Sequence, residues 1–380
     1  MKFKLNLHIY PNNIKSETRI FKQTDSIIRL TNIDKIIIVG IGDNILPQQQ
    51  DLDDHRKIRR INLFMNRFKK SKIIDSLKVL EFYFKIIIYF IWSKPAYVNC
   101  HSLSVLPVSP FFKIFCRSKI IYDAHELETR KFGFGRKMQS VISILEKILI
   151  VFVDKIVVVS DSIGAWYRKE YPNMIISVVR NIPLCDLVHN DSNLKSDYLE
   201  KKFNIPPDHI IFIYQGIISQ ERGVRTLLEV FSKARSDLHI VFMGFGIDTD
   251  KVKQKSTEKV NIHFHEAVKQ SEMKKITSSA HVGFSVLSND CLNHYFCLPN
   301  KVFEYIQSDI PVIASNFPDL KQFVKENEFG WVCEPTFEGI KAVVSTITKK
   351  DIYNCVQQIK IRKNNYDWRN EEIIYIKNFN

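Results

Sequence analysis

Several features that would identify common protein classes are scarce or missing in this sequence of 380 residues. The seven cysteines are odd in number and scattered, and no two form a Cys-x-x-Cys pair. Their spacing indicates neither a zinc site nor a disulfide framework, and it fits a reducing compartment. Only 12 glycines are present, which argues against low-complexity sequence. The motif Gly-x-Gly-x-x-Gly is also missing, which weakens a dehydrogenase interpretation.

The chain also lacks an apolar run long enough to cross a bilayer. Its most apolar stretch, Val79 to Trp92, is 14 residues long and includes Glu81 and Lys85, whereas a spanning helix needs about 20 apolar residues. The first eight residues place charged and polar side chains at alternate positions, so we expect no signal peptide. These features predict a protein that is soluble or bound peripherally to a membrane.

The chain carries a strong positive charge, and the whole excess lies in one half. Residues 1–183 hold 30 Lys and Arg against 16 Asp and Glu, whereas residues 184–380 hold 25 of each. This asymmetry indicates an acidic partner for the first half only. A chain of 380 residues is too long for one ordinary hydrophobic core, so we expect two domains of similar size.

Short β-rich runs alternate with helical patterns along the chain, which predicts an α/β fold with parallel sheets and crossover helices. The expected strands are 3–9, 35–39, 96–100, 119–123, 155–159, 211–215, 239–243, 261–264, 281–286, 310–314 and 330–333. The expected helices lie near 16–30, 72–93, 103–117, 136–153, 223–235, 270–279, 299–307, 318–326 and 336–348. We expect a first domain over 1–183, a polar linker over 184–200, a second domain over 201–365, and a segment over 366–380 that crosses back to the first domain.

The stretch from Leu298 to Tyr305 has the pattern of a helix start that binds an anion. Pro299 suits the first helical position, and the N–H groups that follow it favour a phosphate together with the helix dipole. Lys301 and Glu304 lie three residues apart on one face, and a carboxylate there is able to accept two hydroxyl hydrogen bonds. This combination suits a sugar nucleotide, whereas an ordinary solvated Lys–Glu pair is the alternative.

Two further strand ends carry glycines. The strand that ends at Gly216 is followed by a short loop, and Arg222 and Gly223 open the next helix. The Arg222 guanidinium is then able to bind phosphates with bidentate hydrogen bonds, although an exposed arginine beside a turn glycine is a common alternative. Gly244 and Gly246 permit close backbone approach at the following strand end.

In order and spacing these segments are similar to the donor-binding domain of family 4 retaining glycosyltransferases, whose two facing Rossmann-like domains form the GT-B architecture. The matching segments, over about residues 205–340, are Tyr214-Gln215-Gly216 with Arg222-Gly223, Phe242-Met243-Gly244-Phe245-Gly246, Leu298 to Tyr305, and Ile310 to Asn316. The first half resembles the family less strongly, through Tyr122-Asp123-Ala124-His125-Glu126 and Asp154 to Ser160.

The resemblance implies a role for each matched residue. Glu304 resembles the carboxylate that grips the ribose hydroxyls of the nucleotide, and Arg222 resembles the basic residue that binds the donor diphosphate. His125 resembles the histidine that faces the transferring sugar, and with Glu126 it is the candidate catalytic pair. A structural hydrogen bond is the alternative for His125, and a turn cap is the alternative for Glu126. The candidate donor-binding residues are Gly216, Arg222, Gly223, Gly244, Pro299, Asn300, Lys301 and Glu304.

The chain departs from the family pattern at two positions. Family members often have a second glutamate eight residues before the matched one, where this chain has Phe296, and an arginine after the matched glycine, where it has Ile217. These departures leave open a non-catalytic nucleotide-sugar-binding protein. A sugar-nucleotide epimerase of the same architecture is another alternative, and it would need additional acid and base carboxylates.

The segment from Arg56 to Lys72 holds eight basic residues and no acidic one, interleaved with apolar side chains. Such a segment is able to lie on an anionic membrane surface, and family members that act on lipid-linked acceptors often bind membranes through this domain. A basic surface loop is the alternative, and no nucleic-acid-binding module supports RNA as a partner. The candidate membrane or acceptor patch is Arg56, Lys57, Arg59, Arg60, Arg67, Lys69 and Lys70.

The sequence therefore predicts a retaining glycosyltransferase that moves a sugar from a UDP- or GDP-linked donor to an acceptor held by residues 1–183. We expect no cofactor and no metal, since the sequence Asp248-Thr249-Asp250 has the pattern of a helix start and not of a metal motif. The basic first domain favours a lipid-linked saccharide acceptor at the inner face of the cytoplasmic membrane. Assembly of bacterial surface polysaccharides, such as O-antigen, capsule or lipopolysaccharide, is a process of this kind.

Overall fold

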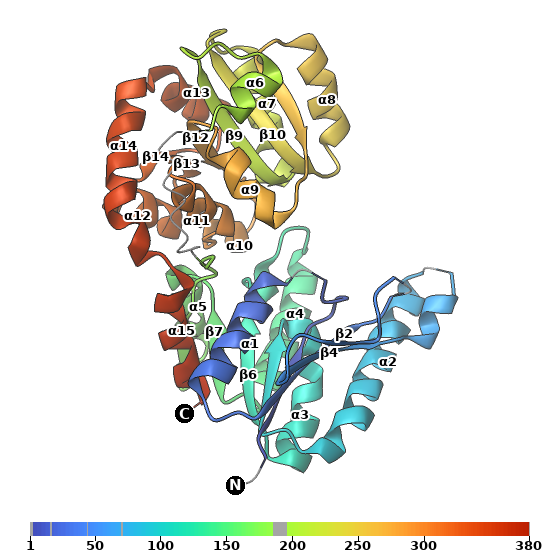
Figure 1. Ribbon diagram of the computed structural model, residues 1–380. Coiled ribbons are helices and arrows are strands. Elements are labelled where there is room, and N and C mark those ends of the chain that lie inside the picture. Colours follow the sequence, from blue (N-terminus) through green and yellow to red (C-terminus); the bar gives the residue numbers. More distant parts are fainter. Residues whose placement is uncertain (1–2, 16, 44, 70, 185–195, 380) are drawn as a thin grey trace. The chain divides into compact units, whose positions relative to one another are not determined.

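The computed structural model describes residues 3–15, 17–43, 45–69, 71–184 and 196–379. The chain divides into two units (Figure 1), which we call unit 1 (Met1–Arg180 and Arg369–Asn380) and unit 2 (Asn181–Trp368). Most of the expected linker, residues 185–195, lies outside the described residues, and its last residues belong to helix α6 (Tyr198–Phe203).

Apolar, β-branched runs form the sheet of unit 1, which has eight strands in the order β3-β4-β2-β1-β5-β6-β7-β8. All neighbouring strands pair in parallel except β3 and β4. Every residue of β1 and β5 is buried, as expected for parallel strands that are covered on both faces. The strands are β1 Leu5–Ile9, β2 Lys35–Ile41, β3 Gln49–Asp51, β4 Arg56–Ile61, β5 Tyr97–His101, β6 Lys119–Ala124, β7 Lys155–Val158 and β8 Ile175–Val178.

Helices and short helical turns connect these strands. They are α1 Thr18–Leu30, η1 Phe64–Arg67, α2 Lys72–Phe90, η2 Ile91–Ser93, η3 Leu103–Val108, α3 Ser109–Phe111, η4 Phe112–Cys116, η5 Glu128–Arg130, α4 Arg136–Ile150 and α5 Asp161–Glu170. The helix expected near 103–117 is divided into η3, α3 and η4. Pro107 and Pro110 explain the division, because a proline lacks the N–H that a continuous helix needs.

The C-terminal segment returns to unit 1, as the sequence predicted. It forms α15 (Trp368–Ile376) and η8 (Lys377–Phe379). Glu372 Oε2 accepts hydrogen bonds from Ser26 Oγ at 2.5 Å and from Arg29 Nη2 at 2.6 Å, both on α1. Tyr97 OH donates to the Phe379 carbonyl at 2.6 Å, so the segment is tied to both a helix and a strand of unit 1.

The sheet of unit 2 has six strands in the order β11-β10-β9-β12-β13-β14, and all of its neighbouring strands pair in parallel. Successive side chains of β9 point to opposite faces. Ile211 and Ile213 pack with Phe303 of α11, whereas Phe212 and Tyr214 belong to the core on the other face. The strands are β9 Ile210–Ile217, β10 Leu238–Phe245, β11 Ile262–Glu266, β12 Val282–Ser285, β13 Val312–Ser315 and β14 Gly330–Cys333.

The remaining elements of unit 2 cover both faces of this sheet. They are η6 Gln220–Arg222, α7 Val224–Ser232, α8 Thr249–Glu258, α9 Gln270–Thr277, α10 Leu292–Tyr295, α11 Asn300–Gln307, α12 Pro318–Glu326, α13 Phe337–Thr346, α14 Lys349–Arg362 and η7 Lys363–Asn365. Helix α8 begins at Thr249, which confirms that Asp248 precedes a helix. The Asp248 carboxylate pairs with Arg225 at 2.8 Å.

Two glycines let β9 and β10 approach closely at their carboxyl ends. Gly216 and Gly244 are partners in the register, and both have a positive φ, 119° and 151° respectively. A Cβ at Gly244 would lie 1.9 Å from the backbone oxygen of Gly216, whereas a Cβ at Gly216 would meet no atom within 4 Å. The strand pair therefore requires glycine at position 244 for space as well as for conformation.

We expect Gly244→Ala to destabilise the protein more than Gly216→Ala. Strain at a positive φ costs about 1–3 kcal/mol and is common to both variants, but only Gly244→Ala adds a clash with backbone. Urea unfolding followed by circular dichroism measures the two losses. Equal losses would contradict the close approach of the strands.

Candidate functional site

The candidate residues of unit 2 lie at the carboxyl ends of its parallel strands, the edge at which open α/β sheets bind ligands. Gly216 and Gly244 are near the ends of β9 and β10. Glu304 of α11 reaches the same edge, where its Oε2 accepts a hydrogen bond from Gln215 Nε2 at 2.6 Å. Pro299 is the N-cap of α11, with an extended ψ of 147°, and Asn300 is the first helical residue. The expectation that Pro299 begins the helix is therefore wrong by one position.

A buried hydrogen-bond network holds Glu304, and the sequence did not predict it. Gln215 is only 2% exposed, and its Oε1 accepts from Thr277 Oγ1 at 2.8 Å. The Gln215 backbone N–H donates to Tyr305 OH at 3.2 Å, and that hydroxyl donates to the Phe284 carbonyl at 3.1 Å. Because the Gln215 amide is fixed at both ends, it fixes the orientation of the Glu304 carboxylate.

Lys301 is not the solvated partner of Glu304 that the alternative interpretation required. Its Nζ is shielded from solvent and has no hydrogen-bond partner among the described residues. The ammonium lies 4.3 Å from the centre of the Tyr214 ring, a cation–π geometry. Burial, and then the charge of Arg222, lower the pKa of Lys301 to about 7, against an opposing effect of Glu304. A buried basic group without a partner is a site that an anion would satisfy.

Arg222 brings a second positive charge to this edge. It ends the turn η6, and Gly223 follows with a φ of 75° as the N-cap of α7. Burial raises the pKa of Tyr214 and lowers that of Lys301, and the charge of Arg222 opposes the first change and adds to the second, so its guanidinium lies near both side chains. Two basic groups beside the amino end of α11 form an arrangement that suits a phosphate group.

The two positions at which the chain departs from the family pattern carry no charge. Ile217 is 50% exposed at the end of β9. Phe296 follows α10, and its ring lies 5.6 Å from that of Tyr295. The structure therefore has an aromatic side chain where a second carboxylate was expected.

In unit 1, His125 and Glu126 directly follow β6 at the carboxyl edge of the sheet. His125 is 21% exposed, and its Nε2 lies 3.1 Å from His101 Nδ1 and 3.5 Å from Asp123 Oδ2. These contacts supply the partners of a structural hydrogen bond, and the partial exposure leaves a catalytic role open. Glu126 is 45% exposed and pairs with Lys131 at 3.1 Å.

Three of these groups could also hold a metal ion. The ligand atoms of His101, Asp123 and His125 all lie within 4.8 Å of one another. The Asp123 carboxylate already accepts from Arg19, at 2.9 and 3.2 Å, and from Gln23 Nε2 at 2.7 Å. Because the Arg19 guanidinium neutralises this carboxylate, a further cation here is disfavoured. That the protein uses no metal stays a prediction.

The predicted basic patch does not form one accessible surface. Arg56, Lys57, Arg59 and Arg60 lie on β4, and alternate side chains of a strand point to opposite faces. Arg60 is 3% exposed and donates to the backbone carbonyls of Asn13, Ile14 and Pro47 at 2.6 to 2.9 Å. Arg56 pairs with Asp53 at 2.6 Å. These two arginines therefore stabilise the fold and are unsuited to a membrane.

The other patch residues lie elsewhere. Lys57 pairs with Asp51 at 3.1 Å, and the Arg59 guanidinium lies 4.7 Å from the centre of the Tyr89 ring. Arg67 ends η1, Lys69 is exposed, and Lys70 lies outside the described residues. The sequence interpretation failed because one run of basic residues divides between a strand, a turn and a helix start.

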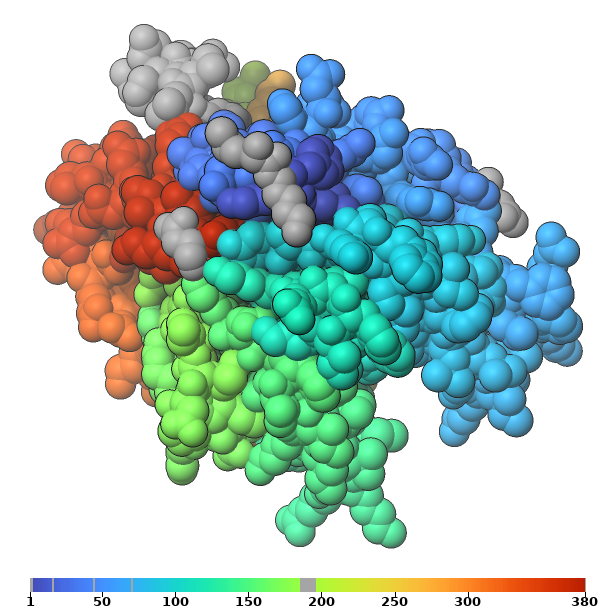
Figure 2. All heavy atoms as spheres, turned by 90° about the horizontal axis from the view of Figure 1, so that it is seen from below, coloured from blue at the N-terminus to red at the C-terminus, as the bar shows by residue number. Residues whose placement is uncertain are grey.

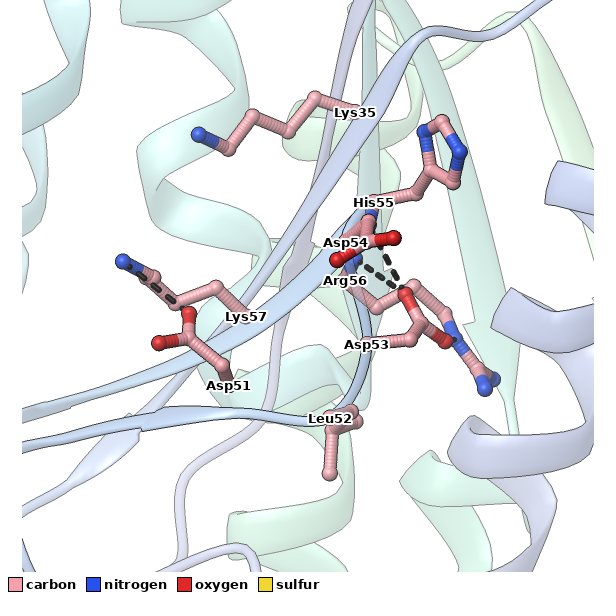
Figure 3. Close-up of a pocket in the computed structure, with 8 residues that line it drawn as sticks. All are labelled: Lys35, Asp51, Leu52, Asp53, Asp54, His55, Arg56 and Lys57. Atoms are coloured by element: carbon pink, nitrogen blue, oxygen red, sulfur yellow. Dashed lines mark hydrogen bonds and ion pairs between the residues drawn. The ribbon is translucent and has the colours of Figure 1, made fainter.

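A pocket of about 460 Å³ lies at the opposite, amino-terminal edge of β2 and β4 (Figure 3). Its lining residues are Lys35, Asp51, Leu52, Asp53, Asp54, His55, Arg56 and Lys57. The ion pairs Asp53–Arg56 and Asp51–Lys57 join residues that line it. None of the candidate donor-binding or catalytic residues lines this pocket.

Comparison with known proteins gives the geometry a context. The family model described as "Glycosyl transferases group 1" matches residues 196–363, which include Gly216, Arg222, Lys301 and Glu304. The protein is a glycosyltransferase. A search of curated protein sequences gives no match.

Solved structures share the fold over nearly the whole chain. Sucrose-phosphate synthase from Thermosynechococcus elongatus is 13% identical, with a TM-score of 0.78 over 97% of this chain and 96% of that one. HepE from Anabaena, in complex with UDP-glucose, is 10% identical, with a TM-score of 0.75 over 99% of each chain. A glycosyltransferase from Rickettsia africae is 16% identical, with a TM-score of 0.68 over 100% of this chain and 99% of that one. The expected GT-B fold is confirmed.

We expect Lys301→Met to raise the thermal stability of the free protein at pH 7 and to remove its stabilisation by UDP. Methionine keeps the length of the side chain but removes a buried basic group that opposes folding while no anion is bound beside it. Thermal unfolding with and without millimolar UDP measures both effects.

Lys341→Met is the matched control. Lys341 is exposed and lies 5.5 Å from the centre of the Phe337 ring, so its loss should change neither quantity. A Lys301→Met protein that is less stable and still responds to UDP would contradict the anion site.

Proposed function

We propose that the protein is a retaining family 4 glycosyltransferase whose donor is a uridine diphosphate sugar. The observation that carries the proposal is the solvent-shielded Lys301 ammonium, which lies beside Arg222 and has no hydrogen-bond partner among the described residues. The complexes of Anabaena HepE with UDP and with UDP-glucose support the choice of nucleotide. The binding of GDP-linked donors is measured in the same way as that of UDP-linked donors.

Each group at the carboxyl edge of unit 2 has a role in this proposal. The diphosphate of the donor occupies the space between Lys301, Arg222 and the first N–H groups of α11. As the bond to the sugar breaks, these positive groups stabilise the charge that develops on the leaving phosphate. Glu304, oriented by Gln215, accepts two hydrogen bonds from the ribose hydroxyls.

Transfer also needs groups that face the sugar. The resemblance assigns this role to His125 of unit 1, and Glu126 beside it is the second candidate. The second carboxylate that many family members place near the sugar is replaced by Phe296, so we expect slow transfer relative to nucleotide binding. Binding without transfer would make the protein a nucleotide-sugar-binding protein, and epimerised donor would make it an epimerase.

We expect Glu304→Gln to weaken UDP binding about 10- to 100-fold, because hydrogen bonds to a charged group contribute about 1.5–3 kcal/mol. The glutamine still accepts from Gln215, so the fold is retained. The same substitution should leave the affinity for 2′,3′-dideoxy-UDP unchanged, since that nucleotide lacks both hydroxyls. Isothermal titration of both nucleotides measures the difference.

Equal losses for the two nucleotides would remove the ribose role of Glu304. The transferase proposal has its own test, in which wild-type protein is incubated with UDP- and GDP-sugars and a saccharide acceptor. Formation of a glycoside with the anomeric configuration of the donor supports it. If no sugar nucleotide binds at millimolar concentration, the enzyme proposal fails.

The acceptor side of the proposal rests on an exposed apolar surface of unit 1. Helix α2 buries Phe82, Ile86 and Phe90 but carries a second apolar stripe that is exposed. We call the exposed residues of α2, η2, α3, η4 and α4 the apolar face. They are Ile73, Leu77, Val79, Leu80, Phe84, Ile88, Tyr89, Trp92, Phe111, Ile114, Phe115, Met138, Val141, Ile144, Leu145 and Ile148.

The elements of the apolar face lie next to one another. Both α2 and α4 contact η3, and η2 contacts η4. In Figure 2 the blue and cyan segments that contain α2, η2 and η4 adjoin the blue-green segment of α4. Soluble monomers rarely expose apolar patches of this extent unless the patch binds a partner or a membrane.

The charge around the apolar face favours an anionic lipid surface as its partner. Residues 72–94, 109–117 and 131–151 together hold ten Lys and Arg against three Asp and Glu. Each basic residue close to an anionic bilayer contributes about 1 kcal/mol of attraction. No helix among the described residues is both long and apolar enough to cross a bilayer, so the proposed binding is peripheral.

We therefore propose that unit 1 binds the inner face of the cytoplasmic membrane through the apolar face and takes a lipid-linked saccharide as acceptor. Surface polysaccharide assembly, including O-antigen, capsule and lipopolysaccharide, is the process that fits this chemistry. A soluble sugar-phosphate acceptor is the competing outcome, and sucrose-phosphate synthase is a structural relative whose name indicates such chemistry.

We expect the double variant Leu80→Ser and Ile144→Ser to bind phosphatidylglycerol vesicles at least about tenfold more weakly than wild type. Each large aliphatic side chain contributes about 1.5–3 kcal/mol when fully buried, and both residues are exposed in the structure, at 60% and 59%. Co-sedimentation with vesicles measures the change. Val260→Ser with Ile361→Ser, exposed aliphatic residues of unit 2, is the control. The proposal fails if the two double variants bind alike.

A further inference from the structure

A row of buried polar side chains runs through the sheet of unit 1 and ends at His125. Asn6 and His8 lie on β1, and Asn99 and His101 lie on the neighbouring strand β5. All four side chains are fully buried. Burial of so many polar groups is costly unless each is hydrogen-bonded, so their arrangement needs a specific explanation.

The hydrogen bonds of this row have a definite direction. Asn99 Nδ2 donates to Asn6 Oδ1 at 2.7 Å, and Asn6 Nδ2 lies 3.2 Å from His8 Nε2. An amide nitrogen only donates, so His8 Nε2 accepts and the His8 proton resides on Nδ1. His8 Nδ1 then donates to His101 Nε2 at 2.8 Å, which places the proton of His101 on Nδ1.

Both histidines of the row are neutral near pH 7. Burial, followed by the neighbouring charge of His101, lowers the pKa of His8 well below its usual value. Burial also lowers the pKa of His101 to about 4, although Asp123 opposes this change. Asn6 therefore fixes the proton of His8 on Nδ1, and His8 fixes the proton of His101 on Nδ1.

At the end of the row, His101 contacts both His125 and Asp123. Its Nδ1 lies 3.1 Å from His125 Nε2 and 3.2 Å from Asp123 Oδ2. Although burial raises the pKa of Asp123, the charge of the Arg19 guanidinium holds it well below its usual value. That carboxylate already accepts from Arg19 and from Gln23. His125 Nε2 is then the acceptor for the His101 proton.

We propose that His101 is a positioning residue for His125, and that the row from Asn99 through Asn6 and His8 sets the proton of His125 on Nδ1. With Nε2 engaged as an acceptor, a neutral His125 carries its proton on the other nitrogen. His125 therefore presents an N–H donor, and not a base, to an oxygen of the substrate. This inference rests on the proposed function, in which His125 faces the transferred sugar.

Two substitutions of His101 separate positioning from packing. The side-chain amide nitrogen of Asn occupies the place of histidine Nδ1, so His101→Asn keeps the donor towards His125. Glutamine instead reaches towards His8 and leaves the donor position empty, so His101→Gln removes it. We expect His101→Gln to lower kcat on the order of 10- to 100-fold with donor KM unchanged, and His101→Asn to recover most of the loss.

The second readout is the tautomer of His125, observed by ¹⁵N NMR of histidine-labelled protein. Wild type and His101→Asn should show a proton on Nδ1, whereas His101→Gln removes the donor to Nε2 and should allow the proton to move there. Thermal unfolding of each variant shows which samples are folded, and the spectra are interpreted for those.

The outcomes distinguish this inference from the proposed function. If wild type transfers no sugar, the proposed function fails, and the tautomer of His125 still decides the inference. The inference is overturned if folded wild type carries the His125 proton on Nε2. It is also overturned if wild type is active and His101→Gln and His101→Asn lower kcat equally.

Discussion

A basic group held away from water without a hydrogen-bond partner among the described residues is the constraint on which the site in unit 2 depends. Lys301 Nζ lies over the Tyr214 ring and near Arg222, and the fold supplies it with no hydrogen bond from the described residues. A protein gains no stability from such an arrangement. It persists because the surrounding core fixes α11 against β9 and β12, with Tyr305 filling the space above Gly283.

In unit 1, by contrast, the buried charge is neutralised by a buried partner of opposite sign. Asp123 is fully buried, but Arg19 neutralises it and Gln23 donates a hydrogen bond to it. Burial lowers the pKa of His8 and of His101, so both are neutral near pH 7. Unit 2 therefore offers unbalanced positive charge to a ligand, whereas unit 1 offers balanced, directed hydrogen bonds.

The sequence predicted the parts of the fold that local patterns determine. The apolar runs indicated the central strands, and periodicity with Pro299 predicted a helix over 299–307, one residue before the observed start of α11. Strand β4 was missed because Ile58 and Ile61 are its only apolar residues, and charged edge regions do not resemble buried strands. Helix α14 was missed because its sequence is polar on most sides.

The site residues that short motifs carry were predicted, whereas those that only the fold brings together were not. Glu304, Lys301 and Arg222 were found because short motifs carry them, although Gln215 was not recognised as the residue that orients Glu304. His8 and His101 are 93 residues apart in sequence and meet only through the pairing of β1 and β5, so no local pattern indicated them. The segment from Arg56 to Lys72 was wrongly predicted to form one basic patch, because the sequence does not reveal that the Arg60 side chain is buried.

Proton uptake on donor binding tests the unbalanced charge of Lys301 most directly. Its pKa of about 7 leaves the amine mostly neutral at pH 8 in the free protein, and a diphosphate beside it raises that pKa, so binding should take up close to about one proton. Calorimetric titration of UDP-glucose in two buffers of different ionisation enthalpy measures the number of protons taken up. The donor itself does not titrate near pH 8, so the uptake reports on the protein. We predict proton uptake by wild type and no heat that depends on the buffer for Lys301→Met. Binding of UDP-glucose to wild type without proton uptake would contradict the anion site at Lys301.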